Sequence, residues 1–322
     1  MLLLGILAAL ILCGLAAVLG FLILCSPKPR PRTENEKYYR DAQSPERKRL
    51  ASLFDSPSVD LSCIVPAFEE SKRLPAMLKE TVDFLETRKN EQDSSFRYEI
   101  IVVDDGSRDT TAQVALQFAE KHQNVDIRVL SLEKNRGKGG AVTQGMLSAR
   151  GKRCLMVDAD GATRFSDLSK LETALDKLTK DGDGHGIAVG SRSHLVTTEV
   201  VVKRSFIRNF LMRCFHSLVY VLGVRGIADT QCGFKLFTRK SAQAVFPNMH
   251  VERWIFDIEC LMIAQLLQIP IAEVQVNWHE IDGSKINLML DSVQMAKDLL
   301  LIRLNYVFGL WTVDKSKLGK SD

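Results

Sequence analysis

Two stretches of the sequence decide the fold, YEIIVVDDGS (98–107) and RCLMVDAD (153–160). Each is a run of apolar residues that stops at acidic residues. A strand of a parallel sheet that is buried on both faces has such a continuous apolar sequence. In open α/β sheets, ligands gather outside the carboxyl ends of the strands. Both stretches therefore predict a buried strand that carries acids to a binding edge.

The chain around these two stretches alternates between apolar runs and helical patterns. The apolar runs lie at 61–66, 98–104, 126–132 and 153–160, and the helical patterns lie at about 74–87, 111–122 and 138–150. Such alternation is typical of a doubly wound α/β fold with a mainly parallel sheet. We expect one Rossmann-like domain over residues 59–285.

Two amphipathic stretches follow in the second half of the chain. Residues 203–222 place apolar side chains at three- and four-residue spacing with basic flanks. This pattern fits a helix in the membrane interface and equally fits a helix packed on the sheet. The stretch LLLIRLNYVFGLW (299–311), in the carboxy-terminal segment 286–322, is too short to span a bilayer and fits either an interfacial element or a core helix.

The charge of the chain is concentrated near its amino terminus. The 322 residues carry 43 Lys and Arg against 39 Asp and Glu, a net charge of +4. Residues 26–50 hold eight basic and four acidic residues, so the other residues carry 35 of each sign. This small and local excess does not indicate nucleic-acid binding, which needs basic residues massed on one face.

The amino-terminal segment predicts a membrane anchor. Residues 1–25 contain no charged side chain, and about 20 apolar helical residues span the hydrocarbon core. A cleaved signal peptide has a basic start and a shorter apolar stretch, so we expect a retained single-pass signal anchor. Basic residues follow it in the Pro-rich segment 26–58, which we expect to form a stiff stalk. The positive-inside rule then places everything after residue 25 in the cytosol.

The acids at the strand ends predict a site for a nucleotide and a metal. Asp104 and Asp105 precede a Gly-Ser turn, where carboxylates can accept hydrogen bonds from a base or ribose. Asp158 and Asp160 are two residues apart, so on an extended backbone both point to the same side. Magnesium prefers one or two carboxylates, with water and substrate phosphates as its other ligands. Lys138 begins a Gly-rich helix start and is expected near the nucleotide.

Several motifs in order give the chain a family resemblance. VPAFEE (65–70), VVDDGS (102–107), NRGKGGA (135–141) and VDAD (157–160) resemble the inverting family 2 glycosyltransferases, which have the GT-A fold. The amino-terminal anchor, GSR (190–192), DTQCGFKLF (229–237) and GSK (283–285) narrow the resemblance to the dolichyl-phosphate sugar synthases. The resemblance covers residues 60–290 and the anchor.

The resemblance implies roles for individual residues. Pro66, Phe68 and Glu70 match the loop that holds the nucleoside, and Asp104 matches the acid at the base or ribose; Val102, Asp105 and Ala159 lie within the same nucleotide-binding motifs. Asp158 and Asp160 match the motif for Mg²⁺ or Mn²⁺ and the diphosphate. Arg192 and Lys285 match basic residues near the phosphates, and Asp229 matches an acid on the acceptor side. Asp160, Asp229 and Arg192 are the candidate catalytic residues. His279 stands where mannosyl relatives have an arginine.

The resemblance also implies the reaction and its location. We expect transfer of glucose from UDP-glucose to dolichyl phosphate with inversion, at the cytosolic face of the endoplasmic reticulum membrane, to make a lipid-linked glucose donor for N-glycan precursor assembly. The spacing of the motifs does not distinguish this reaction from the same transfer with GDP-mannose. A catalytically silent membrane-tethered scaffold is the alternative from another class, and the intact acids argue against it.

Overall fold

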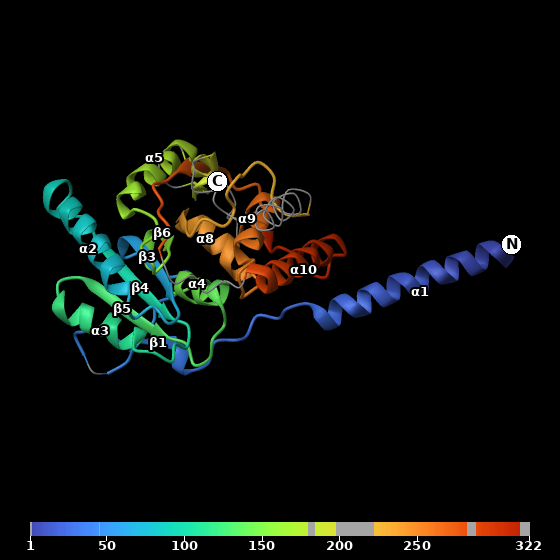
Figure 1. Ribbon diagram of the computed structural model, residues 1–322, viewed down its shortest axis with the longest axis horizontal. Helices are drawn as coiled ribbons and strands as arrows, with labels where there is room; N and C mark the ends of the chain where they lie inside the picture. Colours follow the sequence, from blue (N-terminus) through green and yellow to red (C-terminus); the bar gives the residue numbers. More distant parts are fainter. Residues whose placement is uncertain (1, 45, 180–183, 198–221, 282–287, 316–322) are drawn as a thin grey trace.

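The computed structural model describes residues 2–44, 46–179, 184–197, 222–281 and 288–315 (Figure 1). Of the predicted amphipathic helix at 203–222 only residue 222 is described, and Lys285 lies outside the described residues. The fold is α/β with a mainly parallel sheet, as the alternating sequence pattern predicts.

The centre of the fold is a seven-stranded sheet with the order β5-β4-β3-β6-β8-β7-β9. Its strands are β3 (Val59–Ala67), β4 (Tyr98–Asp104), β5 (Asp126–Ser131), β6 (Gly151–Val157), β7 (Ile187–Ser191), β8 (Phe234–Thr238) and β9 (Ile271–Gln275). Strand β8 runs antiparallel to both of its neighbours, and every other pairing in the sheet is parallel. The apolar run of β4 is buried along its whole length, because helices cover both faces of the sheet.

Helices cover both faces of the sheet (Figure 1), and two hydrophobic clusters of buried side chains hold them against it. The first face carries α2 (Leu74–Glu91), α3 (Thr111–Lys121) and α5 (Leu168–Thr179). The second carries α4 (Lys138–Met146), α8 (Arg239–Val245), α9 (Phe256–Leu266) and α10 (Leu288–Val307). Short 3-10 turns occur at Asn35–Lys37, Phe165–Asp167, Ser193–Thr197 and Phe246–Asn248. This two-sided cover is the doubly wound arrangement.

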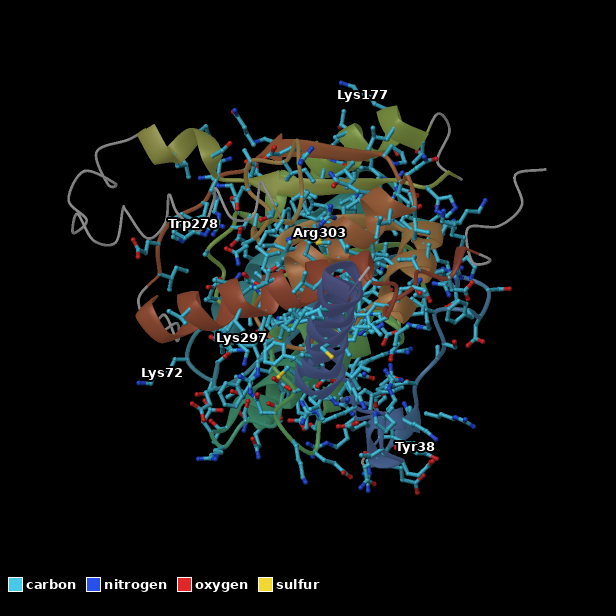
Figure 2. All side chains as sticks on the ribbon, turned by 90° about the vertical axis from the view of Figure 1, so that its right-hand side faces the viewer. Tyr38, Lys72, Lys177, Trp278, Lys297 and Arg303 are labelled. Atoms are coloured by element: carbon cyan, nitrogen blue, oxygen red, sulfur yellow. The ribbon has the colours of Figure 1, made fainter. Side chains whose placement is uncertain are left out.

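The amino-terminal helix α1 (Leu2–Cys25) projects from the body (Figure 1). Its last turn rests on α10, where the Ser26 hydroxyl and the Asn305 side chain are hydrogen-bonded at 2.7–2.9 Å. Figure 2 looks along α1 onto the face that it leaves, where Lys297 and Arg303 of α10 lie. Among the residues that the structure describes, no helix combines the length and the apolar character needed to cross a bilayer.

The segment after α1, which its prolines predict to be a stiff stalk, makes contacts with the body. Residues 30–36, which we call the juxtamembrane strap, lie against the body and hydrogen-bond to the loop before α4 and to α4 itself. The next residues form a small antiparallel pair, β1 (Tyr38–Tyr39) with β2 (Lys48–Arg49), and Arg40 bridges to Val129 of β5. The prolines keep the chain extended, and its charged side chains find partners on the body, which composition alone does not reveal.

Candidate functional site

The carboxyl edge of the sheet gathers the acids that the sequence singles out. Because β3, β4 and β6 are parallel, their carboxyl ends lie at the same edge, where Asp104 ends β4 and Asp158 follows β6, on either side of β3. Strand β8 runs the other way, so the loop 229–233 before it returns to the same edge, where the Asp158 amide donates to the Gly233 carbonyl at 3.1 Å. The Arg192 residue after β7 pairs with Asp229 of this loop. The structure thus brings together acids from three distant segments.

Asp158 and Asp160 form the centre of this edge. Their side chains are 30% and 29% exposed, while Ala159 between them is buried in the core. The side chain of Ala159 therefore faces the core, and its expected place among the nucleotide-binding residues stays a prediction. Burial, and next the charge of Asp158, raise the pKa of Asp160. Two carboxylates whose charges repel in this way would gain from a cation between them.

Lys138 supplies a positive charge to this pair. It is the first residue of α4, and its Nζ lies 2.6 Å from Oδ1 of Asp158. Burial alone would lower the pKa of Lys138, but Asp158 and then Asp257 hold it above its usual value. Asp257, at the start of α9, also pairs with the fully buried Lys235. Lys138 thus lies beside Asp158, and its expected place near the nucleotide stays a prediction.

Asp104 and Asp105 have different surroundings. The Asp104 carboxylate accepts a hydrogen bond from the Ser107 amide at 3.2 Å, and burial raises its pKa. Asp105 accepts from the amides of Arg136 and Gly137 at 2.7 and 2.8 Å, and burial raises its pKa to about 7. Both Asp105 oxygens thus hold the loop that leads into α4. Asp105 therefore holds that loop in place, and its expected contact with the nucleotide stays a prediction.

Arg192 and Asp229 form a two-pronged ion pair. The Nε and Nη2 atoms of Arg192 lie 2.7 and 2.9 Å from the two Asp229 oxygens, and the guanidinium lies 5.5 Å from the ring centroid of Trp278. Burial alone would raise the pKa of Asp229, but Arg192 more than compensates and lowers it. A carboxylate held in its charged form in this way is a weak general base.

The loop after β3 carries the residues expected at the nucleoside. Pro66 is the penultimate residue of β3, and Pro66 and Phe68 are half-buried. The Glu70 carboxylate is engaged by Arg73 through two hydrogen bonds of 2.5 and 2.7 Å. Arg73 also reaches to 3.9 Å from Asp160. Glu70 therefore positions an arginine beside the acid pair, a partnership that the sequence did not reveal.

Two further expected residues lie in different surroundings, Val102 in the core and His279 at the surface near the loop after Asp160. Val102 is fully buried in the core, two residues before the end of β4, so its side chain is not available to a ligand. His279 is exposed, and its amide donates to the Ala162 carbonyl at 3.0 Å, just beyond Asp160. Lys285 lies outside the described residues.

Sequence reasoning missed four residues of this edge: Arg73, Gly233, Asp257 and Trp278. Gly233 carries a readable signal, because it sits in the DTQCG motif; a Cβ atom there would lie 1.9 Å from an Asp158 oxygen. The other three reach the site only through tertiary packing.

The carboxylates at this edge suit a divalent cation whose remaining ligands are water and oxygens of the substrate. Among the described residues, no group of three or more His, Cys, Asp and Glu side chains could hold a metal ion. Asp158 and Asp160 alone provide a partly exposed carboxylate pair. Such a half-shell fits Mg²⁺, which takes few protein ligands and keeps water and phosphate oxygens.

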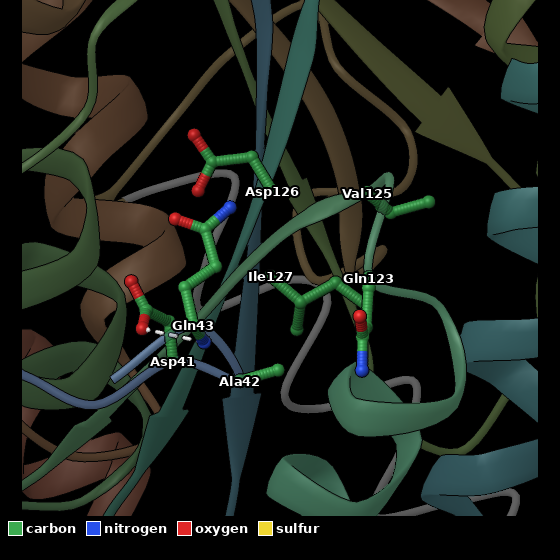
Figure 3. Close-up of a pocket in the computed structure, with 7 residues that line it drawn as sticks. All are labelled: Asp41, Ala42, Gln43, Gln123, Val125, Asp126 and Ile127. Carbon is green, nitrogen blue, oxygen red and sulfur yellow. Dashed lines mark hydrogen bonds between the residues drawn. The ribbon is translucent and has the colours of Figure 1, made fainter. Parts of the chain in front are cut away.

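A small hollow elsewhere on the body is a poor candidate for a binding site (Figure 3). It lies between residues 41–43 and 123–127, at the start of β5, and so at the opposite end of the strands from the acids. Its volume of about 10 Å³ is about that of a single water site.

Comparison with known proteins agrees with this architecture. The model of the family "Glycosyl transferase family 2" matches residues 62–246. The dolichyl-phosphate beta-glucosyltransferase of Dictyostelium discoideum is 51% identical over 284 residues, 87% of this chain and 86% of that protein. The Homo sapiens protein of the same name is 49% identical over 89% of this chain and 87% of that protein. The Saccharomyces cerevisiae protein of that name is 42% identical over 92% and 91%, respectively.

A solved structure supports the fold. The crystal structure of glucosyl-3-phosphoglycerate synthase from Mycobacterium tuberculosis in complex with phosphoglyceric acid has a TM-score of 0.50 to this chain, at 16% identity, and covers 76% of this chain and 80% of that one. At this identity the likeness concerns the fold alone. The family match and the three sequence relatives go further, and this chain belongs to glycosyl transferase family 2.

Proposed function

We propose that this protein transfers glucose from UDP-glucose to dolichyl phosphate with inversion and so makes dolichyl β-D-glucosyl phosphate. The observation that carries the proposal is the 42–51% identity, over about nine-tenths of the chain, to proteins named dolichyl-phosphate beta-glucosyltransferase. The acids at the carboxyl edge support it, because a sugar nucleotide needs a nucleoside contact and a diphosphate site side by side. The product serves as a lipid-linked glucose donor for N-glycan precursor assembly.

The donor lies along the carboxyl edge of the sheet in this proposal. Pro66 and Phe68 contact the nucleoside, and Asp104 accepts a hydrogen bond from the base or ribose. Asp158 and Asp160 are the residues that would hold Mg²⁺ or Mn²⁺, which when bound would supply positive charge at the diphosphate. Lys138 lies 2.6 Å from Asp158 and Arg73 lies 3.9 Å from Asp160, so both can add positive charge at the same diphosphate.

The acceptor needs little activation. A phosphate monoester has a second pKa of about 6, so its oxygen is already an anionic nucleophile at neutral pH. The protein must hold that oxygen behind the anomeric carbon and stabilise the transition state. A single displacement inverts the α linkage of UDP-glucose to a β linkage.

Asp229 and Arg192 act on the acceptor side in this scheme. The lowered pKa of Asp229, caused by its pair with Arg192 against the effect of burial, argues for orientation of the sugar or acceptor over proton abstraction. Arg192 keeps its charge and can bind a phosphate through the part of its fork that Asp229 leaves open. His279, exposed beside the loop after Asp160, contributes a phosphate contact, and Lys285 is expected to contribute another.

The membrane elements give these groups access to a substrate that cannot leave the bilayer. Residues 1–25 act as a single-pass anchor in the endoplasmic reticulum membrane, and the body lies on the cytosolic face, where UDP-glucose is available. The exposed side chains of Val293, Leu300 and Val307 repeat every seven residues along α10 and so share one face. This exposed apolar face, with Lys297 nearby on the helix against which α1 ends, supports an interfacial position for α10.

The reaction is tested with purified full-length protein in detergent, dolichyl phosphate, Mg²⁺ and UDP-glucose labelled in the sugar. We expect a labelled lipid whose anomeric proton shows a β linkage by NMR, and no such lipid without dolichyl phosphate. An α-linked product, or release of free glucose only, would refute the proposal.

The orientation is tested with sealed microsomes. Protease added outside should digest the body while lumenal markers survive. A body that stays intact under these conditions would contradict the cytosolic placement.

A further inference from the structure

The juxtamembrane strap, residues 30–36, makes buried charged contacts with the loop that delivers Lys138 to the acid pair. The two charged groups at the centre of this contact, Glu36 and Arg136, are 2% and 4% exposed. Nη2 of Arg136 lies 2.5 Å from Oε2 of Glu36, and the same guanidinium donates to the strap carbonyls of Arg30 and Pro31 at 2.6 and 2.8 Å. One arginine beside the site thus holds much of the strap.

The contact continues on both sides of this pair. Arg30 donates to the Asn135 carbonyl at 3.0 Å and pairs with Glu252 at 2.8 Å. Arg32 donates to the side chain and the carbonyl of Gln144 in α4, at 2.6 and 2.7 Å. The Glu133 amide donates to Glu36 at 3.2 Å. The strap therefore grips the loop 133–136 and the helix that follows it.

The same loop is gripped from the site side by Asp105. Its carboxylate accepts the amides of Arg136 and Gly137, and the Gly140 amide donates to the Glu252 carbonyl at 2.9 Å. Gly137 has a φ of +91°, and a Cβ atom there would lie 2.7 Å from that carbonyl oxygen, so the loop has little freedom to move. Lys138 emerges from this clamped turn with its Nζ 2.6 Å from Asp158.

We propose that the juxtamembrane strap is a positioning element of the donor site: through Glu36 and Arg136 it fixes the loop 135–140, and thereby Lys138, against the Asp158–Asp160 pair. The segment that leaves the membrane helix is then part of the nucleotide site as well as a tether. Glu36 is a positioning residue, because it acts through Arg136 and touches no substrate. This inference rests on the proposed use of UDP-glucose.

The test compares Glu36→Gln with the matched control Glu34→Gln in the full-length protein. Gln keeps the size of Glu36 and can still accept a hydrogen bond, so the variant should fold. Glu34 lies two residues away, pairs with Lys37, and has a side chain that is 82% exposed. Arg30→Gln, which removes the pair with Glu252, is the second variant. Thermal unfolding is recorded for each protein.

The first measurement needs no substrate. Hydrogen exchange of the amides in 133–140 should quicken in Glu36→Gln and stay as in the wild type in Glu34→Gln. Unchanged exchange in Glu36→Gln would overturn the proposal.

The second measurement separates positioning from general stabilisation. In Glu36→Gln we expect the KM for UDP-glucose and the Kd for UDP with Mg²⁺ to rise about tenfold, equal to about 1.4 kcal/mol, with the KM for dolichyl phosphate within about twofold of wild type. Arg30→Gln should raise the KM for UDP-glucose and the Kd for UDP with Mg²⁺ by a smaller factor. A lower unfolding temperature with an unchanged KM, or an equal rise in both KM values, would overturn the proposal. A wild-type protein without UDP-glucose turnover would instead count against the proposed function, while the exchange measurement would still decide the role of the strap.

Discussion

Gly233→Ala is the substitution that tests the geometry of the acid pair most sharply. A Cβ atom on residue 233 would lie 1.9 Å from Oδ2 and 2.2 Å from Cγ of Asp158, whereas ordinary contacts begin at 3.4 Å. The Asp158 amide donates to the Gly233 carbonyl at 3.1 Å, so the loop and the acid cannot simply separate. The carboxylate must therefore move by about 1.5 Å, the difference between the two contact distances.

That displacement sets the expected loss of activity. A misplacement of about 1 Å in a reacting constellation can cost about 100-fold in rate, which corresponds to about 2.7 kcal/mol of transition-state stabilisation. We expect kcat/KM for UDP-glucose to fall by about this factor. Affinity for Mn²⁺, measured by electron paramagnetic resonance in the presence of UDP, should fall as well.

The control for this variant is Gly184→Ala. A Cβ atom on residue 184 would meet its nearest neighbour at 3.4 Å, an ordinary contact, and the residue lies outside the proposed site. Its activity should match the wild type, and circular dichroism should show both variants folded. A folded Gly233→Ala protein with wild-type kcat/KM and Mn²⁺ affinity would refute the assignment of Asp158 to the metal and diphosphate.

Three further substitutions test individual side chains. Asp158→Asn should lose nearly all glucosyl transfer in the purified assay while the protein stays folded, and unchanged turnover would exclude the metal role. Asp229→Asn should lower the free energy of unfolding at pH 7 by about 2 kcal/mol, the scale of a hydrogen bond to a charged group. Because the pKa of Asp229 is lowered in the fold, this difference should begin to shrink as the pH falls below about 4, the unfolded value, and should be lost as the pH falls through the folded pKa. A constant difference would contradict the ion pair. Asp105 has a folded pKa of about 7, above its unfolded value, so its contribution to stability is complete below about pH 4 and is lost as the pH rises toward 7. Asp105→Asn should remove this pH-dependent contribution, so the variant should gain stability relative to the wild type between pH 5 and pH 8. If the thermal unfolding temperatures of the two proteins changed in parallel with pH, the raised pKa would be contradicted.

The sequence predicted those parts of the site that depend on local order. A buried parallel strand is a continuous apolar run, so the end of the run marks the end of the strand. The sequence alone therefore places Asp104 and Asp158 at strand ends. The spacing of Asp158 and Asp160 likewise follows from the period of an extended chain. Lys138 was placed by the Gly-rich start of its helix.

The parts that the sequence did not predict depend on contacts between distant segments. Arg73 reaches Asp160 only after the helix α2 packs against the segment that follows β6, and the two-pronged pair of Arg192 with Asp229 spans 37 positions. Alternating prolines predict an extended chain but not the part of the body against which it lies. The contact of Glu36 with Arg136 could therefore not be predicted from the sequence. Val102 and Ala159 stand in the right motifs with side chains that face the core, because a motif defines a backbone position and not the direction of every side chain in it.

The central claim is that this chain uses UDP-glucose to glycosylate dolichyl phosphate. The most direct measurement incubates the purified full-length protein with dolichyl phosphate, Mg²⁺ and equal concentrations of UDP-glucose and GDP-mannose, each carrying a different label in its sugar. We predict that glucose enters the lipid fraction with a clear preference and that EDTA abolishes the transfer. A preference for mannose would contradict the claim.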